Sequence, residues 1–134
     1  MISNIYKFIT VLFLFSFNVY AACDDQPVNE VDWTNCNFIE QLDLSGASLA
    51  NAQMTGVNLA LVNLEKSQIN NANLARVNFE GANLFMASFK GANLFEVNFT
   101  GANITNAVFD EANLSNAIWV DGKKCALGSV GQCD

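Results

Sequence analysis

Large apolar residues recur at every fifth position through most of this chain. Sixteen successive centres of the pattern, from Leu44 to Trp119, are all large and apolar. The residue two positions before each centre is Ala in ten units and Val in four, and the residue between the two is Asn in nine. A period of five matches neither the 3.6 residues of a helix nor the 2 of a simple strand, so the pattern predicts an internal repeat.

Two inward residues in every five suit a chain that extends briefly, turns a corner and extends again. Five of the eight glycines fall two positions after a centre, where a turn needs a permissive backbone; they are Gly46, Gly56, Gly81, Gly91 and Gly101. The only proline, Pro27, lies outside the repeats. Four corners close a coil, so residues twenty apart are expected to stack.

The centres also sort by size at a period of twenty. They form four faces: face 1 with Leu44, Leu64, Leu84 and Ile104; face 2 with Leu49, Ile69, Phe89 and Phe109; face 3 with Met54, Leu74, Leu94 and Leu114; face 4 with Leu59, Phe79, Phe99 and Trp119. The aromatic centres occur only on faces 2 and 4, which a period of five alone does not predict. We therefore expect Leu59, Phe79, Phe99 and Trp119 to stack in one column of the core, and Phe89 and Phe109 in another.

Three of the units carry a specific resemblance. Ala-Asn-Leu-Phe-Met at 82–86, Ala-Asn-Leu-Phe-Glu at 92–96 and Ala-Asn-Leu-Ser-Asn at 112–116 resemble the Ala-(Asp/Asn)-Leu-x-x units of the pentapeptide-repeat family. The resemblance covers all of 42–121. It implies an all-β fold, a right-handed quadrilateral β-helix, here with about four full coils and a partial coil before them.

The partial coil is expected to be out of step with the rest. Val31-Asp32-Trp33 and Cys36-Asn37-Phe38 are two further units, but Phe38 and Leu44 are six residues apart. Gln41 is therefore predicted to form a bulge. With it, residues 23–41 make an N-terminal cap and partial coil, 42–121 the β-helix and 122–134 a C-terminal cap.

Residues 1–22 have the pattern of a secretory signal peptide. Lys7 supplies positive charge, an apolar stretch follows from Phe8 to Val19, and Val19-Tyr20-Ala21 offers small residues for cleavage before Ala22. The apolar stretch is too short for a membrane span, so we expect a periplasmic or secreted protein without a span after cleavage. An uncleaved anchor is one alternative. A lipoprotein modified at Cys23 is another, which Tyr20 disfavours because a lipobox has Leu there.

The four cysteines flank the repeats in two local pairs, Cys23 with Cys36 and Cys125 with Cys133. Local disulfides are the favoured connectivity because a rod separates its two ends. Each bridge would then staple a cap across an open end of the β-helix. Cys36 occupies a small inward position, so a buried free thiol is the alternative there. The tail from Trp119 to Cys133 also resembles a segment that follows exported arrays of this family.

Catalysis and metal binding find little support. The chain has no His, its cysteine spacings do not match a zinc pattern, and no glycine-rich phosphate loop is present. We expect no enzyme activity, no metal and no cofactor. The net charge is −7, with thirteen acidic and six basic residues. Nucleic-acid binding is unfavourable for such a surface.

Surface recognition of a protein partner remains. Phe85, Met86 and Phe95 follow centres and should point outward, although Phe85 and Phe95 lie on opposite faces. The Asn columns are expected to be structural, as ladders that satisfy turn backbone. We expect a binding or scaffold module, monomeric or dimerised end to end. The resemblance also allows an acidic DNA mimic that inhibits or protects DNA gyrase, and an exported effector acting outside the cell is a further alternative.

Overall fold

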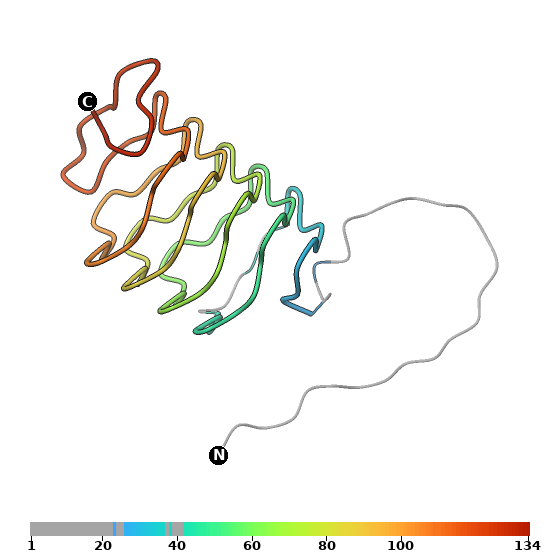
Figure 1. Ribbon diagram of the computed structural model, residues 1–134. Helices are drawn as coiled ribbons and strands as arrows, with labels where there is room; N and C mark the ends of the chain where they lie inside the picture. Colours follow the sequence, from blue (N-terminus) through green and yellow to red (C-terminus); the bar gives the residue numbers. More distant parts are fainter. Residues whose placement is uncertain (1–22, 24–25, 37, 39–41) are drawn as a thin grey trace, which may run out of the picture.

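The repeats wind into a short β-helix in the computed structural model, which describes Cys23, 26–36, Phe38 and 42–134 (Figure 1). The signal peptide predicted at 1–22 and the bulge predicted at Gln41 lie outside the described residues. Within the described part the chain contains no helix, and each five-residue unit contributes one bridged residue in place of an extended strand. Parallel bridges join residues twenty apart from Asp43–Asn63 to Asn98–Ile118.

Three hydrogen bonds per unit join successive coils. The N–H of Leu64 donates to the carbonyl of Asn83 (2.8 Å), and the N–H of Asn83 donates back to Val62 (2.9 Å). The N–H of Lys66, at the corner, donates to Phe85 (2.9 Å). A fourth bond closes each corner within its own coil, as in the turn from Leu64. In the units between Val62 and Gly101, four of the five backbone N–H groups are thus bonded to backbone carbonyls without long strands.

Every corner residue from Gly46 to Asn116 has a positive φ, the feature that type II turns require of their third residue. The predicted glycine positions are among them, with φ between 65° and 72°. Asn occupies four further corners, but six carry other side chains in the same conformation: Leu61, Lys66, Arg76, Met86, Glu96 and Glu111. The fold therefore imposes the left-handed conformation at all these corners, even where the residue does not favour it.

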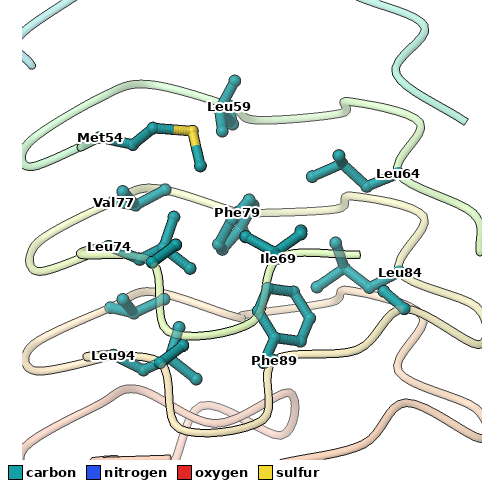
Figure 2. Packing of buried hydrophobic residues seen from close by; sticks show 14 of the residues in the cluster. Met54, Leu59, Leu64, Ile69, Leu74, Val77, Phe79, Leu84, Phe89 and Leu94 are labelled. Carbon is teal, nitrogen blue, oxygen red and sulfur yellow. The ribbon is translucent and has the colours of Figure 1, made fainter. Parts of the chain in front are cut away.

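The interior is filled by the centres and by the small residues before them (Figure 2). Phe79 stacks on Phe99 with ring centroids 5.7 Å apart, and Phe89 on Phe109 at 5.3 Å. Rings of the two columns meet edge to face across the core, as Phe79 and Phe89 do at 6.0 Å. Trp119 contacts Phe99 edge to face at 5.6 Å and is half-buried at the end of its column.

The N-terminal half coil is out of register by one residue. Asp32 bridges Gln53, a separation of 21 in place of 20. Asn35 lies over Gly56, so the extra residue falls after Asn35, in the stretch where the spacing predicts it. This half coil is bonded to face 3, where the N–H of Trp33 donates to the carbonyl of Gln53, and the rings of Trp33 and Phe38 pack at that end with centroids 5.2 Å apart.

The C-terminal segment turns back on the last coil in the opposite direction. Antiparallel bridges join Val130 to Asn113 and Lys124 to Ile118, so the segment lies over faces 3 and 4. In Figure 1 it is the red segment beside the C-terminus, and it leaves part of the last coil uncovered.

Candidate interaction surface

Three of the four faces carry ladders of polar side chains along the rod. The Nδ2 of Asn83 donates to Oδ1 of Asn63 (3.1 Å), and the next rungs repeat this bond at intervals of twenty residues. The same Oδ1 atoms accept the backbone N–H two residues later, as Asn83 does from Phe85 (3.3 Å). The members are Asp43, Asn63, Asn83 and Asn103; Gln53, Asn73, Asn93 and Asn113; and Asn58, Asn78 and Asn98. These amides are engaged within the rod, as the sequence suggests.

The described residues of face 2 form no such ladder. There, asparagines at other positions accept hydrogen bonds from the next coil. Asn70 Oδ1 accepts hydrogen bonds from Ser88 Oγ (2.6 Å) and from the N–H of Lys90 (3.2 Å). Asn29 does the same for Ser48 (2.8 Å) and for the N–H of Ala50 (3.0 Å). The repeat pattern does not reveal this arrangement, because both asparagines lie outside the ladder position.

The three side chains expected to form a contact surface are exposed unequally. Met86 is 46% exposed at its corner, whereas Phe85 and Phe95 are half-buried. Leu61, at the corner between faces 4 and 1, is more exposed, at 59%. Leu61 is not among the predicted contact residues, although its corner position is a sufficient signal for exposure.

The three cations of the repeats each have an acidic neighbour. Arg76 and Glu96 lie on adjacent coils, and the Nε of Arg76 is 3.0 Å from the Oε2 of Glu96. The pairs Lys66–Glu65 and Lys90–Glu111 lie at 2.8 Å and 3.8 Å. All are exposed pairs, which contribute little to stability. The pairing interrupts the negative charge along the rod.

Three aspartates hold the turns that follow them. Hydrogen bonds from Thr34 lower the pKa of Asp32, and those from Ser45 lower the pKa of Asp43. The backbone N–H of Lys123 does the same to the pKa of Asp121. Each is an Asx turn that favours the ionised carboxylate.

Both cysteine pairs are disulfide-bonded. Cys23 and Cys36 have Cα atoms 5.5 Å apart, and Cys125 and Cys133 have theirs 4.9 Å apart. Each bond lies at one end of the array, and the described residues include no free thiol.

Among the described residues, no cluster of three or more His, Cys, Asp or Glu side chains could hold a metal. The same residues include no helix of the length and apolarity needed to cross a membrane. The described surface presents corner side chains and exposed charges.

A family model of pentapeptide repeats matches residues 43–81, 63–101 and 92–118, in eight copies. Comparison with the curated proteins finds no match. Among solved structures, the pentapeptide repeat protein Rfr23 from the cyanobacterium Cyanothece 51142 is 34% identical, with a TM-score of 0.56. That match covers 58% of this chain and 54% of the other, so the chain spans about half the length of that relative.

A second structure extends the likeness over more of the chain. A pentapeptide repeat protein of the Arabidopsis thaliana thylakoid lumen matches with a TM-score of 0.54 and 17% identity. The match covers 81% of this chain and 85% of that one. These neighbours identify the winding as a right-handed β-helix.

Proposed function

The chain belongs to the pentapeptide repeat family, and from this premise we propose that it is an exported, non-enzymatic binding or scaffold module. Its binding surface is the side of a rod of about four coils, and its partner is a protein of the compartment outside the cytoplasm. The observation that carries the proposal is the pair of disulfides, one at each end of the array. Disulfides form and persist in oxidising compartments.

Export is the part of the proposal with the most support from the residues. The signal pattern at 1–22 precedes the first bonded cysteine directly. A lipid on Cys23 would consume the sulfur that bonds Cys36, so the disulfide favours a periplasmic or secreted protein over a lipoprotein.

The side of the rod is suited to recognition because it is preorganised. The ladders and inter-coil bonds use the polar groups of the flat faces, which leaves the corners for contact. The corner with Phe85 and Met86 presents adjoining apolar side chains, one half-buried and one exposed. Rigid apolar anchors lose little entropy on binding. We assign the main contact to this corner and a weaker one to Phe95.

Fractionation of the native protein, with sequencing of its mature N-terminus, tests the compartment. We expect a chain beginning near Ala22, recovered outside the cytoplasm in oxidised form. An intact N-terminus in the cytoplasmic fraction with free thiols contradicts the proposal.

Co-purification from the same compartment tests the surface. The variant Phe85→Ser/Met86→Ser should lose the partner, whereas Leu61→Ser, at another exposed corner, should retain it. Equal retention by both variants assigns the contact elsewhere.

The main alternative is an acidic DNA mimic acting on DNA gyrase. Its acids would have to line up along the rod, but Glu65, Glu80, Glu96 and Asp110 stand at four different corners. We expect purified protein neither to inhibit gyrase supercoiling nor to protect gyrase from a fluoroquinolone. Protection at micromolar concentration would favour the DNA-mimic function over the exported one.

A further inference from the structure

Met86, at the corner between faces 1 and 2, carries an oxidisable group on an exposed side chain. The described part of the chain contains two methionines, and they differ sharply in burial. Met86 is 46% exposed, whereas Met54 is 0% exposed and lies among the core side chains in Figure 2. A thioether is apolar and polarizable, and two-electron oxidants convert it to a polar sulfoxide. The residue assigned above to the partner contact is therefore also the exposed thioether of the described residues.

No thiol of the described residues competes with Met86 for such an oxidant. All four cysteines are bonded in the disulfides Cys23–Cys36 and Cys125–Cys133. The compartment proposed above is an oxidising one, without the cytosolic thiol pool that keeps cysteines reduced. An oxidant that reaches the described part of the rod therefore meets the Met86 thioether before any other thioether or thiol.

The backbone at Met86 is held in place by its neighbours. Its N–H donates to the carbonyl of Thr105 on the next coil (3.0 Å), and the N–H of Ala87 closes the corner onto the carbonyl of Leu84 (3.0 Å). The core is filled from the centres and the small positions, not from this corner. Oxidation of Met86 is therefore expected to change the surface of the rod and to leave its core intact.

We propose that Met86 is a redox-sensitive contact residue, whose oxidation to the sulfoxide by a peroxide releases the protein partner. The inference rests on the function proposed above and adds a means of regulating it. The thioether sulfur attacks one peroxide oxygen, so that an S–O bond forms and the O–O bond breaks. The sulfur loses two electrons to the leaving oxygen, which also takes the proton of the attacked oxygen and departs as water. A reductase with a dithiol reverses the change, since the sulfoxide oxygen leaves as water and the dithiol becomes a disulfide.

The sulfoxide weakens the contact because it places a polar oxygen on an apolar corner. In the complex this oxygen is buried beside Phe85 against an apolar partner surface, where an acceptor without a donor is unfavourable. One such group is expected to weaken binding about tenfold. In the free rod, water satisfies the same oxygen. By reciprocity, the bound partner protects Met86 from oxidation.

Treatment of the purified, disulfide-bonded protein with hydrogen peroxide tests the site without any partner. Peptide mass measurement should show Met86 gaining one oxygen at least about tenfold faster than Met54, since accessibility controls the reaction. The melting temperature should not change when Met86 alone is oxidised. The variant Met86→Leu should gain no oxygen on that timescale. Equal rates at the two methionines, or unfolding on oxidation of Met86, overturn the proposal.

Co-purification from the compartment outside the cytoplasm tests the consequence. Peroxide treatment of the protein should lower the amount of bound partner about tenfold. Met86→Leu, which is apolar and resists the oxidant, should retain the partner with and without peroxide. Met86→Gln, which is polar without oxidation, should bind weakly in both cases.

The outcomes separate the regulation from the function on which it rests. Full retention of the partner by the Met86 sulfoxide form, or by Met86→Gln, overturns the redox role and leaves the binding function in place. Failure of both the untreated protein and Met86→Leu to retain any partner overturns the binding function, and the redox role with it.

Discussion

Between Val62 and Gly101 every unit makes the same three inter-coil hydrogen bonds, whereas the two ends of the rod close in different ways. The N-terminal end adds a parallel half coil, shifted by one residue and bonded from Cys23 to Cys36. The C-terminal end adds an antiparallel segment bonded from Cys125 to Cys133. The middle coils are thus stabilised by the repeated bonds to their neighbours. Each terminal coil lacks a neighbour on one side, so each end of the rod is covered by a segment with a different structure.

The largest effect is expected in the middle, at the stacked aromatic column. Phe99 is fully buried between Phe79 and Trp119, so Phe99→Ala should lower the free energy of unfolding by about 3–5 kcal/mol. Phe95→Ala, at a half-buried corner, should lower it by well under half as much. Denaturant unfolding measures both variants. Equal losses would overturn the distinction between inward and corner positions.

Removing the end disulfides should have the next largest effect. They close loops of 13 and 8 residues, for which the chain-entropy model gives about 2.9 and 2.5 kcal/mol. Cys23→Ser/Cys36→Ser and Cys125→Ser/Cys133→Ser should therefore destabilise by similar amounts, despite the different architecture of the two ends. Thermal unfolding of both pairs of variants measures this, and a loss at one end only would show that the other cap is held by packing.

The regular middle is also where the sequence is most informative. Period-twenty sorting of the centres is sufficient to predict the columns of Phe79 and Phe89, because a repeated inward position has one possible neighbour in the next coil. The ends break the repeat and are less predictable. Nothing in the spacing of Lys124 and Val130 indicates that the tail returns antiparallel over two faces only. The path of the tail depends on its hydrogen bonds to the backbone of the last coil, which the side-chain pattern does not reveal. Asn29 and Asn70 were missed for a related reason, because they act from outside the ladder position.

Smaller effects are expected at the corners. They test whether a positive φ at a residue other than glycine lowers the stability of the protein. Met86 has a φ of 57° and an exposed side chain, so Met86→Gly should stabilise the protein by up to about 1 kcal/mol. Gly91→Ala should destabilise it, because an added Cβ would meet the Oδ1 of Asn71. Opposite shifts in melting temperature are the expected result. Shifts of the same sign would mean that corner conformation does not control stability.

The smallest effect concerns the Asx turns, which the two ends share. The pKa values of Asp32 on the N-terminal half coil, Asp43 on the first full coil and Asp121 before the cap are all lowered by hydrogen bonds to the following turn. A carboxylate with a lowered folded pKa contributes stability above its unfolded pKa, near 3.9, and loses it as the pH falls through the folded value. Stability should therefore be flat from pH 7 to about 5 and decline below about 4. The variant Asp32→Asn/Asp43→Asn/Asp121→Asn keeps a side-chain acceptor for each turn without the titrating charge, so its decline should be shallower. An unchanged acid slope in this variant would assign the pH dependence to other carboxylates and leave the turns at the two ends without an electrostatic role.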